Sequence, residues 1–127
     1  MRLVSFSLID PHHLRLLGVH LVPIVAKHGN YNLVGNVFGF PPSTAHVPAD
    51  AHWASRRRLP TTIPPTKRGT DWDIVYGLEV TGGAHLAFDK SWKLRYRVGG
   101  NSYVLVGGID DVLLSRHHAC PNTLPGR

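Results

Sequence analysis

Apolar and polar side chains alternate through the second half of this chain, and this alternation restricts the possible folds more than any other feature. Over 71–80 every second residue is apolar, and over 92–98 the apolar residues alternate with Lys93, Arg95 and Arg97. A period of two residues is typical of a β-strand with one buried face. The pattern predicts two strands that share one core and leave the cations in water.

The second face of the 71–80 strand is mixed in character. Asp73 and Glu79 share it with Val75 and Gly77. A strand with such a face usually has solvent on that side. We therefore expect this face to border water.

Glycine pairs mark the turns around these strands. Gly82–Gly83 precede a short predicted strand over 84–88, and a last apolar piece over 109–114 is expected to complete the sheet edge. Gly99 and Gly100 with Asn101 can supply the positive φ angles of a tight hairpin. Residues 102–106 should then return antiparallel to 92–98.

The first half of the chain also indicates strands. Residues 2–9 partly alternate, with one predicted face formed by Val4, Phe6 and Leu8. Residues 14–25 are rich in Leu and Val, and their predicted face consists of Leu17, Val19 and Leu21. A helix over 14–25 is the disfavoured alternative, because an interior Gly costs about 1 kcal/mol and an interior Pro about 3 kcal/mol relative to Ala.

A further strand is predicted over 31–40, and the residues from 41 to 69 form a proline-rich connection with little regular structure. Turn signals every eight to twelve residues favour a sandwich over a doubly wound fold. The predicted fold is an all-β, antiparallel sandwich of about seven to eight short strands, Ig-like in form. One domain is expected over 1–115, with a flexible tail over 116–127.

Composition agrees with a single folded unit. The chain has 127 residues, of which 43% are hydrophobic and 17% charged, which suits a globular domain rather than a disordered segment. Its single cysteine, Cys120, excludes an internal disulfide. The most apolar stretch, 14–26, is interrupted by polar residues and proline, so we expect no membrane span. The first ten residues do not resemble a signal peptide.

Candidate catalytic and metal-binding residues are few. The pairs His12–His13 and His117–His118 lack a paired-cysteine motif or a zincin-type helix, so solvated turns are the preferred interpretation. Cys120 lies in the predicted tail, where nothing would hold a base beside it. The glycines are not arranged as a phosphate-binding loop. We therefore expect no enzyme activity, no cofactor and no metal.

Two basic clusters remain as candidate binding surfaces in a chain of net charge +6 and pI near 10.0. One is Arg56, Arg57 and Arg58 in the proline-rich connection. The other is the exposed face of 92–98, which we call the basic stripe: Lys93, Arg95 and Arg97. A solvated, edge-protecting face is the simpler interpretation of the stripe, and the sequence leaves no aromatic residue beside these cations, because Trp92 and Tyr96 should point inward.

Trp53 stands next to His52 and close to the arginine triplet. Displayed on a loop, it would anchor a protein partner, because Trp and Arg are enriched at interface hot spots. Folded back, it would cover one end of the sandwich. The sequence leaves both alternatives open.

The order of these pieces resembles a loosely defined set of uncharacterised envelope proteins from high-GC Gram-positive bacteria. The similarity runs through 14–25 with its Val22-Pro23, the Phe40-Pro41-Pro42 exit, the Arg56-Arg57-Arg58-Leu59-Pro60 stretch, the 74–80 strand and the hairpin that begins at Leu94. The resemblance implies a short Ig-like sandwich held outside the membrane by an N-terminal anchor. No functional residue is established for this set of proteins, so the resemblance assigns none here. The expected anchor is lacking in this sequence, which would fit a soluble relative or a start codon placed too late.

These observations predict a non-catalytic binding or structural module at the bacterial cell envelope. Its positive charge would suit an anionic envelope polymer, a lipid surface or a protein partner. The alternative is a cytosolic nucleic-acid-binding module that uses the same basic stripe. If the gene extends upstream into an apolar anchor, the cytosolic alternative is excluded.

Overall fold

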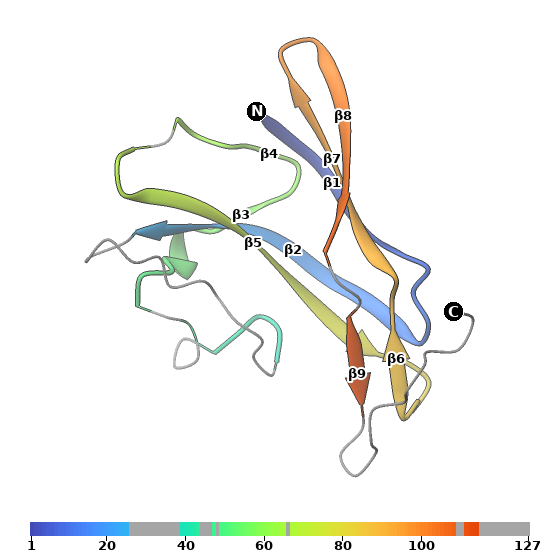
Figure 1. Ribbon diagram of the computed structural model, residues 1–127. Coiled ribbons are helices and arrows are strands. Elements are labelled where there is room, and N and C mark those ends of the chain that lie inside the picture. Colours follow the sequence, from blue (N-terminus) through green and yellow to red (C-terminus); the bar gives the residue numbers. More distant parts are fainter. Residues whose placement is uncertain (26–38, 44–46, 48, 66, 109–110, 115–127) are drawn as a thin grey trace.

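The computed structural model describes residues 1–25, 39–43, 47, 49–65, 67–108 and 111–114, and most of them lie in antiparallel sheets (Figure 1). Sheet 1 has the strand order β4–β1–β7–β8 and comprises Thr61–Thr62, Arg2–Ile9, Ser91–Val98 and Asn101–Gly107. Sheet 2 has the order β3–β2–β5 and comprises Arg57–Arg58, Leu14–Val25 and Thr70–Val80. A two-stranded piece pairs β6 (Leu86–Phe88) with β9 (Val112–Leu114), and η2 is a 3₁₀ turn over Trp53–Ser55.

The main core lies between sheets 1 and 2. Sheet 1 supplies Leu3, Phe6 and Leu94, and sheet 2 supplies Leu21, which is 1% exposed. Partly buried aromatic and aliphatic residues pack around them, in particular Trp72, Ile74, Tyr76, Trp92 and Tyr96. The all-β, antiparallel, sandwich-like fold is confirmed. The alternating apolar residues of β5 and β7 named here point inward as predicted, whereas Val80 and Val98 at the strand ends are exposed.

A β-bulge in β1 changes which of its side chains face this core. The register between β1 and β7 shifts between Leu3 and Ser5, so that Val4 is the extra residue. Leu3 is 2% exposed, whereas Val4 is only partly buried. The predicted face of Val4, Phe6 and Leu8 is therefore wrong at Val4, because one extra residue reverses the alternation.

Strand β2 contains a second bulge. The predicted strand over Leu14–Val25 is confirmed, but its register with β5 shifts between Leu16 and Gly18. Leu17 is the extra residue and is 43% exposed, while Val19 packs against the main core. The predicted face is wrong at Leu17 for the same reason as in β1.

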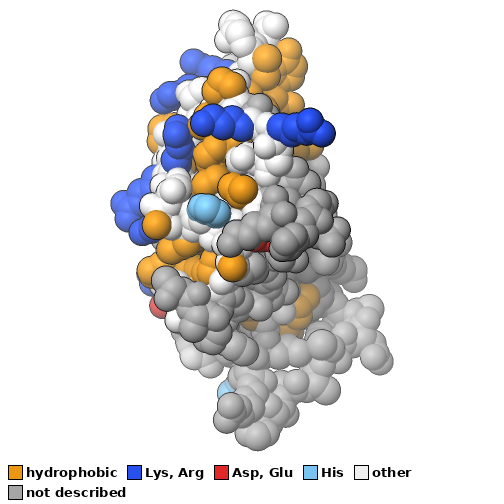
Figure 2. All heavy atoms as spheres, turned by 90° about the vertical axis from the view of Figure 1, so that its left-hand side faces the viewer, with side chains coloured by type: hydrophobic (Ala, Val, Ile, Leu, Met, Phe, Trp, Pro, Cys, Tyr) orange, Lys and Arg blue, Asp and Glu red, His pale blue; other side chains and the backbone are white. Residues whose placement is uncertain are grey.

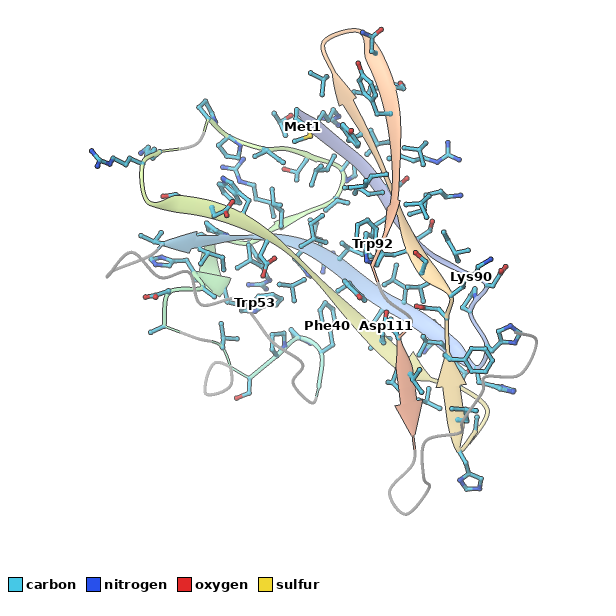
Figure 3. All side chains as sticks on the ribbon, in the orientation of Figure 1. Met1, Phe40, Trp53, Lys90, Trp92 and Asp111 are labelled. Carbon is cyan, nitrogen blue, oxygen red and sulfur yellow. The ribbon has the colours of Figure 1, made fainter. Side chains whose placement is uncertain are left out.

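Part of the second face of sheet 2 is covered, which corrects the expectation of solvent at Val75, whereas the side chain of Glu79 stays 43% exposed in its ion pair with Arg15. Trp53 and Ala51, which precede β3, are buried there against Val22 and Ile24. Figure 3 shows Phe40 and Trp53 on the side of β2 and β5 that faces away from β1 and β7. The segment before β3 thus covers the sheet and forms a second core.

Two paired glycines make room for the ring of Phe40 in this second core. Gly18 and Gly77 lie opposite each other on β2 and β5. A Cβ atom on Gly77 would lie 2.2 Å from the Phe40 ring, and one on Gly18 would lie 3.0 Å from it. The absence of side chains at these positions therefore lets the ring lie directly against the sheet.

The proline-rich connection contains more regular structure than predicted. Arg57–Arg58 pair with β2 at the edge of sheet 2, and Thr61–Thr62 pair with β1 at the edge of sheet 1. Only Leu59 and Pro60 separate the two short strands. The connection therefore joins the edges of both sheets.

The end of the sandwich near β6 is closed by the segment that leaves β8. Asp89, which is buried, accepts a hydrogen bond from the Asp111 N–H at 3.1 Å, and its own N–H donates to the Asp111 carbonyl. The indole of Trp92 lies against Gly107 and Gly108, where a Cβ atom would come within 3.2 Å and 2.1 Å of it. These contacts hold the exit of β8 against the core.

Several sequence predictions fall on residues that lie outside the described part of the chain. These are most of the strand predicted over 31–40, the first two residues of the apolar piece 109–114, and the tail over 116–127. The strand predicted over 84–88 is present as the shorter Leu86–Phe88.

We expect Gly77→Ala to destabilise the fold by about 1–3 kcal/mol, because the added methyl group forces the Phe40 ring off the sheet. Chemical denaturation measures the free energy of unfolding. Gly100→Ala is the matched control, since nothing lies within 4 Å of a Cβ atom there, and its effect should stay within about 0.5 kcal/mol. Equal losses in the two variants would contradict the packing role of Gly77.

Candidate functional site

The outer face of sheet 1 gathers the positive charge of its strands. The four strands of this sheet contain four cations and no carboxylate. The cations are Arg2 of β1 and the basic stripe Lys93, Arg95 and Arg97 of β7, and we call these four residues the cationic face.

The strand register brings the four cations onto one side of the sheet. Arg2 lies directly opposite Arg97, and Ser5 and Ser7 lie opposite Arg95 and Lys93. Residues directly opposite in an antiparallel pair share a face and lie about 5 Å apart, and alternate residues of one strand lie about 7 Å apart. Since the core side chains Leu94 and Tyr96 occupy the other face, the cations point away from the core.

Sequence reasoning missed Arg2 as a member of this face. Arg2 stands alone near the start of the chain, with no basic neighbour to mark it. Only the pairing of Arg2 with Arg97 places it beside the stripe. A prediction of the β1–β7 register would have found it, but the β-bulge after Leu3 obscures that register.

Among the described residues, no acidic side chain pairs with the cationic face. In the part of the chain that the structure describes, no ion pair joins any of the four cations to a carboxylate. The ion pair between Arg15 and Glu79 lies on sheet 2. Like charges at this spacing repel one another, so a bound anion would relieve an unfavourable interaction.

A row of uncharged side chains runs beside the stripe on the same face. Lys93 lies opposite Val106, and Arg95 lies opposite Val104. The two valines are 57% and 56% exposed. The outer face of the β7–β8 hairpin therefore presents cations and aliphatic groups side by side.

The exposed tyrosine of this hairpin lies on its other face. The rings of Tyr96 and Tyr103 stack with centroids 5.4 Å apart, and Tyr96 packs against the main core. Trp92 also packs there, as predicted. Stacking aromatic groups are thus separated from the cations by the sheet itself.

The arginine triplet lies elsewhere, at the edge of sheet 2. The guanidinium of Arg56 lies 4.8 Å from the centre of the Trp53 ring and donates a hydrogen bond of 3.1 Å to the Trp53 carbonyl. The guanidinium of Arg57 lies 5.7 Å from the centre of the Trp72 ring. Arg58 is exposed and pairs with His20 across β3 and β2. The structure does not place the triplet on the face of the basic stripe.

Trp53 is not displayed as a partner anchor. Its side chain is only 9% exposed and belongs to the second core. Of the two alternatives left by the sequence, the structure has Trp53 folded back, because the apolar second face of sheet 2 needs a cover. Figure 2 shows this side of the molecule, with Lys and Arg side chains in its upper half and hydrophobic side chains between them.

His20 is buried between aromatic rings in this second core. Its ring lies 5.3 Å from that of Trp53 and 5.7 Å from that of Phe40. Its Nδ1 is buried without a hydrogen-bond partner among the described residues. Burial, and then the charges of Arg56 and Arg58, lower the pKa of His20. The imidazole is therefore neutral and serves packing.

The other titratable groups in the core also have structural contacts. The Tyr76 hydroxyl donates a hydrogen bond of 3.1 Å to Asp111, and burial, followed by the carboxylate of Asp111, raises the pKa of Tyr76. His12 stacks on Phe88 at 4.6 Å, while His117, His118 and Cys120 lie outside the described residues. Within the described ranges, no three His, Cys, Asp or Glu side chains are grouped as metal ligands, and no helix has the length and apolarity to span a membrane.

Comparisons with protein-family models, with curated proteins and with solved structures give no match to this chain.

We expect the pH dependence of stability to report on His20. Because the pKa of His20 in the folded state lies below its usual value of 6.5, the unfolded chain binds the proton first. The contribution of His20 to stability is therefore complete above about pH 6.5 and is lost as the pH falls toward the folded-state pKa. Urea denaturation at about pH 7.5 and about pH 5.5 measures the loss. His20→Leu should reduce the difference between the two pH values.

The exposed His13 provides the control for this measurement. His13→Asn should keep the pH dependence of the unmodified chain. An undiminished dependence in the His20→Leu variant would show that other groups cause it.

Proposed function

We propose that this chain is a non-catalytic binding module of the bacterial cell envelope, and that the cationic face binds closely spaced phosphate groups of an envelope polymer or a lipid surface. The observation that carries the proposal is the set of four cations on one face of a sheet without a carboxylate. Such a surface attracts polyanions over several ångströms and discriminates against polycations.

The spacing of the cations supports binding of a chain of anions. Arg95 and Arg97 are exposed and lie about 7 Å apart along β7, which is comparable with successive phosphates of an extended polymer. Arg2 adds a second row next to Arg97. Two adjacent rows can contact several phosphates at once, so that many weak contacts add up.

The same face supports binding rather than a reaction. Its hydroxyl groups belong to Ser5, Ser7, Thr62, Ser91 and Ser102. The strands of sheet 1 carry no histidine or carboxylate that could act as a base for them. The face therefore lacks the arrangement that nucleophilic catalysis requires.

The envelope location and the Ig-like form of the sandwich are parts of this proposal that rest on the resemblance described above. The resemblance concerns the order of the segments. A gene that continues upstream into an apolar anchor would support this location.

A nucleic-acid-binding module is the second candidate, because the same cations would bind its phosphates. Proteins that bind single strands usually place aromatic side chains beside the basic groove, and the bases stack on them. Here Tyr96 and Tyr103 lie on the opposite face from the basic stripe. This separation favours a partner that offers phosphates but no bases to stack.

The direct test is binding of inorganic polyphosphate by the double variant Arg95→Gln/Arg97→Gln. Removing two of the four cations should weaken binding by at least tenfold and lower the slope of log K against log salt by about 1.4, at about 0.7 per cation for a single-stranded polyanion. A salt titration followed by calorimetry or fluorescence anisotropy measures both quantities.

Lys67→Gln/Arg68→Gln is the matched control, because it removes two exposed positive charges outside sheet 1. It should keep the slope and most of the affinity. Equal losses in the two double variants would show that net charge, rather than the cationic face, determines binding. Much tighter binding of a single-stranded DNA of equal charge would favour the second candidate.

A further inference from the structure

The β7–β8 hairpin concentrates the exposed apolar side chains of the molecule. Five of the nine large hydrophobic residues that are exposed in the described part of the chain belong to it: Val98, Tyr103, Val104, Leu105 and Val106. Figure 1 shows that the closed end of this hairpin projects away from sheet 2. A cluster of this kind usually marks a surface that contacts a partner or a membrane.

Strand β8 itself has none of the sequence features that normally protect a sheet edge. It contains no charged residue and no proline, and its register with β7 is continuous, without a bulge. Natural edge strands carry such features to prevent pairing with other chains. The unprotected edge and its exposed valines therefore indicate a surface that contacts a partner.

The cations beside the exposed valines indicate the chemical class of the partner. Each valine of the outer row lies opposite a cation, Val104 opposite Arg95 and Val106 opposite Lys93. A surface that is cationic and aliphatic at once is complementary to the interface of an anionic bilayer, where phosphates lie next to the first methylene groups of the acyl chains.

We infer that the β7–β8 hairpin binds the interface of an anionic bilayer, with the basic stripe on lipid phosphates and with Val104 and Val106 inserted among the upper acyl groups. This inference rests on the proposed function and selects one of its two ligand classes. The backbone groups of the β8 edge stay at the level of the headgroups, where water can reach them.

Other occupants of this surface fit the observations less well. A soluble polyanion would contact the cations and leave both valines in water. A second copy of the chain would bring a further net charge of +6 and an identical cationic row toward the first. An anionic bilayer alone contacts the cations and the valines together.

The test is co-sedimentation of the full chain with vesicles of phosphatidylcholine containing about one-third phosphatidylglycerol. Val104→Thr/Val106→Thr keeps the branched shape of both side chains but replaces two methyl groups with hydroxyls. Partitioning into these vesicles should fall about tenfold, because each buried methylene-sized group contributes about 0.8 kcal/mol. Binding to soluble polyphosphate should not change.

Val80→Thr/Val112→Thr is the matched control, because these two valines are 36% and 40% exposed and lie outside the hairpin. This variant should partition like the unmodified chain. Far-UV circular dichroism and thermal unfolding should show the same fold in both variants, since exposed substitutions of this kind change stability by less than about 0.5 kcal/mol.

The outcomes separate this inference from the proposed function. Unchanged partitioning of the Val104→Thr/Val106→Thr variant, or equal binding to pure phosphatidylcholine, would overturn the inference. Failure to bind vesicles together with intact polyphosphate binding would also overturn it and leave the proposed function standing. A dimer in solution by light scattering that does not bind vesicles would assign the surface to a second copy. Failure of the unmodified chain to bind polyphosphate would contradict the proposed function.

Discussion

Burial of both faces of strand β2 is the interaction on which the rest of the structure depends. Leu21 contacts the core shared with sheet 1, while Val22 and Ile24 contact Trp53 and Ala51 on the other side. One strand therefore connects two cores, and sheet 2 is the middle layer between sheet 1 and the segment that precedes β3. Sheet 1 buries only one face, which leaves its outer face free to carry charge.

Arginine has two different roles in this chain, and the packing separates them. Arg56 and Arg57 lie over the rings of Trp53 and Trp72 and shield the edges of the cores. Arg95 and Arg97 point away from the core into water, with no carboxylate in their sheet. Charge counted along the sequence treats these groups alike, whereas Arg56 and Arg57 contact aromatic rings and Arg95 and Arg97 share one outer sheet face with Arg2.

Much of the fold could be predicted from the sequence, because alternation reports directly on which face of a strand is buried. Its failures at Val4 and Leu17 have one cause: a bulge adds a single residue, and a period of two contains no signal for it. Trp53 could not be placed, since its burial depends on a sheet face formed by distant residues. The cationic face was predicted except for Arg2, whose position follows from strand pairing alone.

The short strands β3 and β4 have a mechanical consequence. Arg57–Arg58 pair with sheet 2 and Thr61–Thr62 pair with sheet 1. The two sheets are therefore connected by a segment in which only two residues separate the paired strands. Neither sheet can slide or rotate far over the other unless one of these pairings breaks. A force that displaces sheet 1 is therefore transmitted to sheet 2 through this short segment.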